Sequence, residues 1–170
     1  MFSALYICAS WTTFAAERKR PTELVYPKST MFYFVVRHLR WLARIPGLPQ
    51  LFDALMLAAT WLFCRDRLAA MEDLELQALR LPGLRLKVHK LGGTEFVRDG
   101  RELGHLHGNG LLDVALGRLT AQTLLAAGRV QPHHVFPNSK WVSFQLESQR
   151  DVAFGVELLT TANASFPMGR

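Results

Sequence analysis

The sequence predicts an α+β protein in which helices pack on one face of an antiparallel sheet of about four to five strands, after an N-terminal helical segment. Two observations lead to this fold. Residues 31–80 carry apolar side chains at helical spacing. Residues 85–146 alternate apolar and polar side chains in short runs divided by glycine turns, the pattern of half-buried strands. Such short turns favour antiparallel pairing of consecutive strands.

The composition narrows the class of protein. The chain has 170 residues, of which 49% are hydrophobic and 20% charged, so it is long and apolar enough for one folded domain. Its two cysteines, Cys8 and Cys64, lack metal-site spacing, and a reducing cytoplasm is the expected location. The net charge of +6 comes from residues 1–92. This half is also rich in aromatic residues, which favours peripheral contact of residues 1–64 with an anionic membrane over nucleic acid, although a solvated helix face is an equal alternative.

The pattern divides the chain into three parts. Residues 1–16 are apolar but fall short of the roughly 20 residues that a membrane-spanning helix needs, and a charged linker follows. Two helices are expected next, at 31–44 and 50–79, because Pro46 and Pro49 break the run between them. The predicted parts are a mobile or anchoring segment (1–30), a helical segment packed on the domain or on a membrane surface (31–80), and an α+β domain (81–170).

The elements of the last part follow from local signals. Asp99-Gly100 is the preferred pair for a two-residue type I′ turn. This turn predicts that Phe96 faces Leu103 and that Thr94 faces His105. Thr120 and Gly128 are the expected cap and stop of a short helix. The expected strands are 85–89, 94–98, 101–107, 111–116 and 140–146, the expected helices are 121–127 and 151–161, and 129–140 is expected to be irregular.

Four of the six histidines lie within thirty residues and form the candidate site. His105 and His107 are two apart on a predicted strand, so their side chains point to the same face. The glycine turn 108–110 then decides where Asp113 lies. A three-residue loop puts His105 opposite Asp113, whereas a two-residue loop sends the carboxylate to the other face. Both registers fit the sequence. The second histidine pair, His133-His134, follows the short helix.

Residues 87–162 resemble the luciferase-domain family, whose characterised member is a fungal luciferase that oxidises 3-hydroxyhispidin. The fungal motifs are matched by Arg101-Glu102-x-x-His105-x-His107, by Gly128-x-x-Gln131-x-His133 and by Trp141. The bacterial branch of the family is closer, through His-x-x-Gly-Gly-x-Glu-Phe (His89 to Phe96), Pro132-His133-His134 and Ser139-x-Trp141. Two features depart from the fungal pattern: the turn after His107 is shorter, and Asp113 stands where that enzyme has a histidine.

The resemblance implies a cofactor-free oxygenation, with O2 as co-substrate and no metal. A hydroxylated α-pyrone loses a proton and attacks dioxygen, and the endoperoxide loses CO2 with light emission. Such chemistry needs a base, donors for anionic oxygens and a dry pocket. We expect His105 or His107 to be the base, oriented by Asp113 or Glu102. The other expected site residues are Arg101 and His133, which would hold the anionic oxygens, and His89, His134, Phe96, Phe136 and Trp141, which would contact the substrate.

Two other functions remain open at this point. His105, His107, Asp113 and His133 could instead bind a metal ion, which would make the protein a metal-dependent dioxygenase or hydrolase. The protein could also be a non-enzymatic module that holds a flat apolar ligand at a membrane surface. Each residue has a structural alternative as well, because buried histidines are usually hydrogen-bonded structural groups and a tryptophan is more often core than ligand wall.

Overall fold

The computed structural model describes Trp41 and residues 45–165. The predicted segment 1–30 and nearly all of the predicted helix 31–44 lie outside the described residues. Within them the α+β class is confirmed, and the sheet has six strands, one more than the upper end of the predicted range. The strands are β1 (Leu84–Val88), β2 (Thr94–Arg98), β3 (Arg101–Leu106), β4 (Leu111–Ala115), β5 (Gln131–Pro132) and β6 (Trp141–Gln145). The helices are α2 (Leu48–Phe63), α3 (Arg65–Ala78), α4 (Arg118–Ala126) and α5 (Gln149–Ala164).

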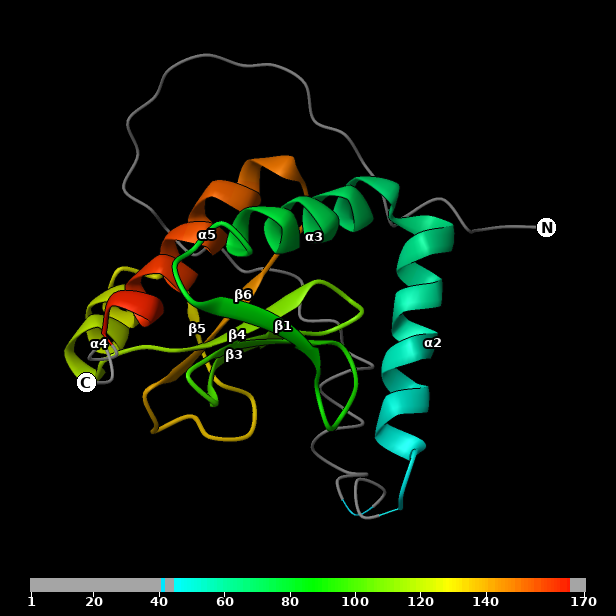
Figure 1. The fold of residues 1–170 in the computed structure, drawn as a ribbon, viewed down its shortest axis with the longest axis horizontal. Helices are drawn as coiled ribbons and strands as arrows, with labels where there is room; N and C mark the ends of the chain where they lie inside the picture. Colours follow the sequence, from blue (N-terminus) through cyan, green and yellow to red (C-terminus); the bar gives the residue numbers. More distant parts are fainter. Residues whose placement is uncertain (1–40, 42–44, 166–170) are drawn as a thin grey trace.

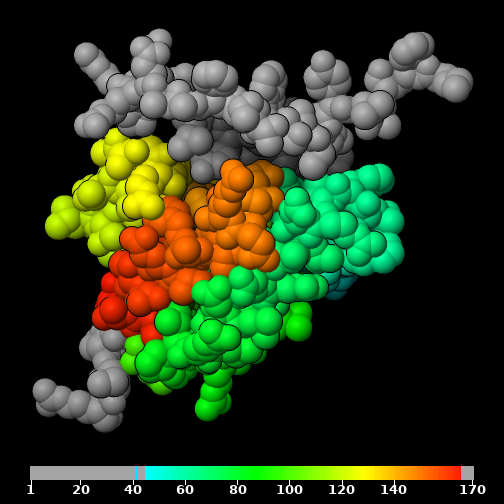
Figure 2. Space-filling model, turned by 90° about the horizontal axis from the view of Figure 1, so that it is seen from above, coloured from blue at the N-terminus to red at the C-terminus, as the bar shows by residue number. Residues whose placement is uncertain are grey.

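The sheet is antiparallel, in the order β1-β2-β3-β4-β6-β5. Figure 1 shows α3 and α5 on one face of the sheet, with α2 running past its side. Seen from above in Figure 2, α3 in green and α5 in orange to red lie next to each other across this face. The predicted arrangement, with helices on one face of the sheet, is therefore confirmed, and the opposite face is left for the candidate site.

The hydrophobic core fills the space between these two helices and the sheet. Leu74 of α3, Leu158 of α5 and Leu112 of β4 are all at most 1% exposed and belong to one core cluster. The two helices approach closely at Gly155, where an added Cβ would lie 2.9 Å from Leu74 Cδ1. Burial of such apolar side chains is the main favourable term in folding.

The predicted single helix 50–79 is wrong, because it breaks at Cys64, which has φ −135° and ψ 62°. The two halves bury side chains against different surfaces. The helix after Cys64 buries Ala70, Met71, Leu74 and Ala78 in the core. The helix before Cys64 buries a stripe that points to the turns at the end of the sheet, so one straight helix could not serve both surfaces.

That stripe on α2 combines two polar residues with one methionine. Its members, Asp53, Met56 and Thr60, are spaced i, i+3 and i+7 and so lie on one side of the helix. Asp53 Oδ1 accepts a hydrogen bond of 2.9 Å from Gly108 N, and Thr60 Oγ1 donates one of 2.8 Å to Gly108 O. An added Cβ on Gly108 would lie 2.6 Å from the Asp53 carbonyl oxygen. Polar contacts therefore dock α2 on the loop that follows His107.

Smaller corrections concern the end of the chain. The segment 129–140, predicted to be irregular, contains β5, a two-residue edge strand in which Pro132 is tolerated. The helix α4 begins at Arg118, so Thr120 lies inside it rather than at its cap. The helix α5 begins two residues earlier than expected, after a capping box between Ser148 and Asp151.

A separate observation concerns membranes. Among the described residues, every helix is too short or too polar to cross a bilayer.

Candidate functional site

The candidate site is built on one row of paired residues across the sheet. His105 of β3 faces Asp113 of β4, and Asp113 faces Ser143 of β6. Leu106 and Leu112, the next pair along these strands, lie in the core. Because successive side chains alternate between faces, the row with His105 lies on the face opposite the helices.

The turn after His107 has the three-residue form. His107 N donates a hydrogen bond to Leu111 O, and Gly110 N donates one to His107 O. Gly110 has φ 81°, a left-handed conformation that suits glycine. Of the two registers that the sequence left open, the structure has the one that puts Asp113 beside the histidines.

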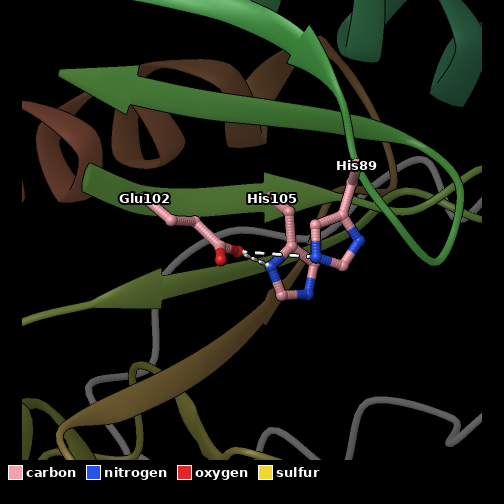
Figure 3. A group of neighbouring side chains, drawn as sticks. All are labelled: His89, Glu102 and His105. Atoms are coloured by element: carbon pink, nitrogen blue, oxygen red, sulfur yellow. Dashed lines mark hydrogen bonds and ion pairs between the residues drawn. The ribbon is translucent and has the colours of Figure 1, made fainter. Parts of the chain in front are cut away.

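A β-bulge brings Glu102 to the same face as His105. Residues three apart on a regular strand would point to opposite faces. The register of β2 and β3 shifts between Phe96 and Val97, so that Leu103 is an extra residue on β3. Glu102 Oε1 therefore lies 2.6 Å from His105 Nδ1, and Figure 3 shows the two side chains pointing toward each other.

The same bulge overturns the predicted hairpin register and the predicted role of Phe96. The observed pairs are Phe96–Gly104 and Thr94–Leu106, in place of Phe96–Leu103 and Thr94–His105. Phe96 is completely buried in the core cluster. The prediction that Phe96 contacts a substrate is therefore wrong, because its ring lies on the helix-covered side of the sheet.

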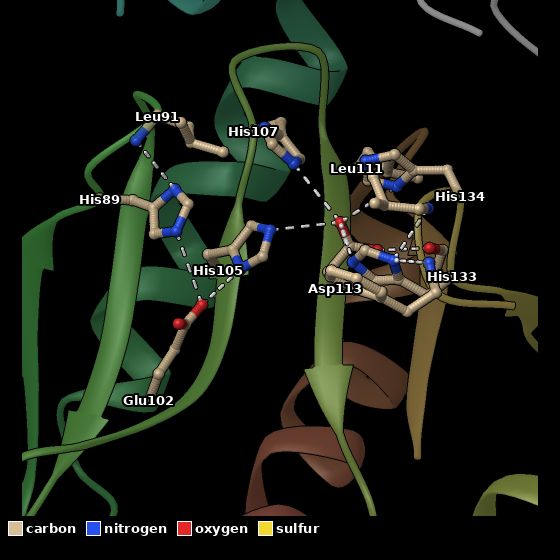
Figure 4. A network of polar contacts seen from close by, with 12 residues as sticks. His89, Leu91, Glu102, His105, His107, Leu111, Asp113, His133 and His134 are labelled. Carbon is tan, nitrogen blue, oxygen red and sulfur yellow. Dashed lines mark hydrogen bonds and ion pairs between the residues drawn. The ribbon is translucent and has the colours of Figure 1, made fainter. Parts of the chain in front are cut away.

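Asp113 is the centre of the site, between the His105–His107 pair and the His133–His134 pair in Figure 4. Its Oδ1 accepts a hydrogen bond from Ser143 Oγ, and its Oδ2 is buried without a hydrogen bond. Four imidazole nitrogens surround Oδ2, namely His105 Nε2 at 3.3 Å, His107 Nε2 at 3.4 Å, His134 Nδ1 at 3.5 Å and His133 Nε2 at 3.7 Å. These distances are longer than the roughly 2.7–3.2 Å of ordinary N–H···O hydrogen bonds.

The second ring nitrogens distinguish these histidines. His105 Nδ1 lies 2.6 Å from Glu102 Oε1, and His107 Nδ1 lies 3.4 Å from Asp53 Oδ1. Because an ionised carboxylate only accepts hydrogen bonds, the Nδ1 of His105 is the donor to Glu102, and the Nδ1 of His107 faces the carboxylate of Asp53. His133 differs, because its Nδ1 accepts hydrogen bonds of 3.1 Å from two backbone N–H groups, those of residues 135 and 136. Its proton is therefore on Nε2.

Aromatic rings lie beside this cluster. His89 stacks on His105 with ring centroids 4.3 Å apart, and its Nε2 lies 3.7 Å from Glu102 Oε1. The Trp141 ring lies 5.7 Å from His105. Phe136 stacks on His133 at 5.5 Å and is 59% exposed. Phe136 is thus the ring at the site that is open to solvent.

Carboxylates raise the pKa of the two histidines nearest to them. Burial opposes the protonation of His105, but Asp113 and Glu102 outweigh burial and raise its pKa to about 9. Burial also opposes the protonation of His107, whose pKa is raised by Asp113 and Asp53. These carboxylates therefore favour positive charge where the two imidazoles meet.

The pKa values of the other site residues are lowered. Burial is the main reason that the pKa of His89 and that of His134 fall to about 4, and it also lowers the pKa of His133. Burial alone would raise the pKa of Asp113, but the adjoining imidazoles outweigh it and hold this pKa well below its usual range. Asp113 is thus a buried carboxylate that stays ionised because of its neighbours.

Most of the predicted site residues come together, but Arg101 does not. One cluster contains nine of them, namely His89, Glu102, His105, His107, Asp113, His133, His134, Phe136 and Trp141. Arg101 is exposed beside the Asp99-Gly100 turn. Since strand neighbours alternate, its position is on the face opposite Glu102, and the structure does not bring it into the cluster as predicted.

Two members of the cluster were missed from the sequence. Asp53 was not among the predicted site residues, although it is 5% exposed and contacts His107. A lone carboxylate within an apolar stretch of helix was the available signal. Ser143, which is 1% exposed, lies on the same side of β6 as Trp141, and this alternation could have marked it.

Comparison with known proteins gives one result. Residues 100–162 match the family model described as Luciferase domain. Neither the curated proteins nor the solved structures include a match to the chain. The matched segment runs from the Asp99-Gly100 turn to α5 and contains both histidine pairs, Glu102 and Asp113. Residues 100–162 therefore match the luciferase-domain family, as their motifs predicted, and this match indicates a luciferase-like function in general terms.

Proposed function

We propose that the protein is an oxygenase of the luciferase type that acts on a hydroxylated α-pyrone or a similar flat enol. The observation that carries the proposal is the buried cluster around Asp113, in which four imidazoles approach one carboxylate oxygen. The reaction consumes one O2 and releases one CO2, and both oxygen atoms enter through an endoperoxide. It therefore needs no external reductant.

The cluster offers the groups that such a reaction requires. His105 is held from both sides, by Glu102 at Nδ1 and by Asp113 at Nε2, so its ring has a fixed orientation. In the cofactor-free route that the sequence suggests, an imidazole takes the enol proton. The Nε2–H of His133 is a donor for an anionic oxygen, in the role predicted for it.

The direct test is oxygen uptake by the purified full chain with 3-hydroxyhispidin as the probe. We expect O2 consumption matched by CO2 release, with light as a further readout. His105→Asn keeps a donor for Glu102 but removes Nε2, and it should lower uptake by about 10²- to 10⁴-fold, the range for loss of a positioned acid–base group. Wild-type protein that consumes no O2 with this or another flat enol would contradict the proposal.

We also propose that α2 contacts an anionic lipid surface. The helix buries the side that carries Asp53, Met56 and Thr60, and it leaves six large apolar side chains exposed, at Leu51, Leu55, Leu57, Trp61, Leu62 and Phe63. Arg65 lies 4.6 Å over the Trp61 ring, a pair of the kind that suits a membrane interface with acidic headgroups. This supports the peripheral contact expected for residues 1–64, and the same surface would serve a non-enzymatic module.

Vesicle flotation tests the lipid contact. Wild-type protein should float with vesicles that contain phosphatidylserine, and Leu62→Glu should float several-fold less, because a charge replaces an apolar side chain on this face. The matched control is Leu119→Glu, which changes a leucine on α4 that is even more exposed than Leu62 and should float as the wild type does. Equal flotation of the two variants would argue against α2 as the lipid contact.

A non-enzymatic binding module would hold 3-hydroxyhispidin without turnover, and His105→Asn would leave that binding intact.

A further inference from the structure

We propose that His105, His107 and Asp113 bind a divalent transition-metal ion, as a triad of two histidines and one carboxylate. The inference deepens the proposed function, on which its catalytic meaning rests. Three groups of possible ligands exist among the described residues, and only this one has all three members buried. Its ligand atoms lie within 4.8 Å of one another.

The distances fit a common metal ion better than they fit hydrogen bonds. Donor atoms about 2.1 Å from a tetrahedral or octahedral ion lie about 3.0–3.4 Å from their neighbours. The Nε2 atoms of His105 and His107 lie 3.3 Å and 3.4 Å from Asp113 Oδ2. That oxygen is buried without a hydrogen bond, a costly state that an ion would relieve.

Each histidine of the triad also has the outer partner that metal-bound histidines usually have. A ligating imidazole commonly donates its second N–H to a carboxylate, which fixes the tautomer and strengthens the ligand. Glu102 does this for His105, and Asp53 is placed to do it for His107. An ion that binds here replaces the Nε2 protons, so that both Nε2 lone pairs then face it. Asp53 comes from α2, so the docked helix completes the site.

His133 is excluded as a ligand by its hydrogen bonds. Its Nδ1 accepts two backbone N–H groups, so its proton is on Nε2, the nitrogen that faces Asp113. A protonated nitrogen cannot bind a metal ion. The metal site predicted from the sequence included His133, and the structure removes this residue from the set of ligands. His134, with Nδ1 3.5 Å from Asp113 Oδ2, is the nearest further nitrogen.

The donor set indicates which ions can bind. Imidazole and carboxylate donors suit Fe²⁺, Mn²⁺, Co²⁺ and Zn²⁺ and exclude the soft ions that select thiolates. Two histidines and one carboxylate leave coordination positions open, and in oxygenases such positions admit substrate and O2. A divalent ion bound there would stabilise the enolate of the proposed substrate as a Lewis acid.

Two matched variants test the site without any substrate. The full chain is stripped with a chelator, loaded with Co²⁺, desalted and measured for metal content and visible absorption. Wild-type protein and His133→Asn should each keep about one ion per chain, and His105→Asn should lose it. In both variants asparagine reproduces the Nδ1 side of the ring and deletes Nε2. Loss of the ion from both variants, or retention by both, would overturn the ligand assignment.

A milder variant keeps the test valid if the ligand variant folds poorly. Glu102→Gln leaves all three ligands and should weaken Co²⁺ binding by about 10- to 100-fold, the range for lost outer partners. Unchanged affinity would contradict the role of Glu102, and wild-type protein that binds no Co²⁺ or Fe²⁺ would refute the site.

If the chelated protein consumes O2 with the enol at the full rate, the metal inference fails and the proposed function stands. If the protein binds the ion but turns over no enol, the metal site stands and the proposed oxygenase function fails.

Discussion

Replacing Asp113 with asparagine is expected to lower oxygen uptake with 3-hydroxyhispidin by about 10²- to 10⁴-fold. Asparagine has the same shape and can still accept the hydrogen bond from Ser143, but it carries no negative charge. Without that charge, the four imidazoles lose the group to which they are all oriented, and a metal ion loses its only anionic ligand.

The measurement is kcat/KM from an oxygen electrode, together with Co²⁺ content and the free energy of unfolding in urea. Removing one partner of a buried ion pair costs about 3–5 kcal/mol, which is an upper limit here because the histidines can release their protons. The matched control is Ser143→Ala, which deletes the donor to Oδ1 and leaves Oδ2 and the imidazoles in place. A fall of less than about tenfold is expected for it, the worth of one hydrogen bond to a charged group. An equal fall of kcat/KM in the two variants would show that the negative charge of Asp113 is not needed for oxygen uptake.

The strands β1 to β4 and their antiparallel pairing were predictable because the signals are local. Alternation along β3 puts His105 and His107 on one face, and the Asp99-Gly100 pair marks the turn before them. Short turns between strands then lead to antiparallel pairing, so fold class and the first half of the site follow together. The glycine turn after His107 was compatible with two loop lengths, and contacts from outside it select one.

The contacts of α2 are what local patterns could not supply. Gly108 is enclosed by Asp53 and Leu57 of a helix some fifty residues earlier in the chain. Asp53 also binds Gly108 N, so the helix holds the loop in its three-residue form. In sequence, Asp53 is only one charge in an apolar stretch. Its role depends on where the helix breaks and docks, which the helical period does not give.

The bulge on β3 is a second case in which packing overrides pattern. On a regular strand that keeps His105 in the site, Leu103 would point to the site and Glu102 to the core, whereas the structure has Leu103 in the core and Glu102 in the site. One extra residue satisfies all three side chains. The gain comes from burial of Leu103, and the geometric result is a carboxylate 2.6 Å from His105 Nδ1.

The roles of the site histidines also required their hydrogen-bond partners. From sequence, His105 and His133 are equivalent imidazoles near one carboxylate. In the structure, one donates from Nδ1 to Glu102 and the other accepts at Nδ1 from two backbone N–H groups. These opposite tautomers separate a metal ligand from a hydrogen-bond donor. The backbone N–H groups of residues 135 and 136 determine this difference, and the residue types in the loop do not predict it.

Two phenylalanines that were both predicted to contact substrate are expected to behave in opposite ways. Phe96→Ala should lower the free energy of unfolding by about 3–5 kcal/mol, because a fully buried aromatic ring leaves a cavity in the core. The folded fraction should keep its KM for the flat enol, since the ring lies on the other side of the sheet from Asp113.

Phe136→Ala is the matched variant, because it deletes the same ring from the solvent-open edge of the site. Its stability should stay within about 0.5 kcal/mol of the wild type, since the ring is 59% exposed. Its KM for 3-hydroxyhispidin should rise about three- to tenfold, because a stacked aromatic contact is worth about 0.5–1.5 kcal/mol. Urea unfolding and oxygen-uptake kinetics measure both quantities. A raised KM in Phe96→Ala, or a large loss of stability in Phe136→Ala, would mean that the substrate reaches the cluster from the helix-covered side, which contradicts the placement of the site.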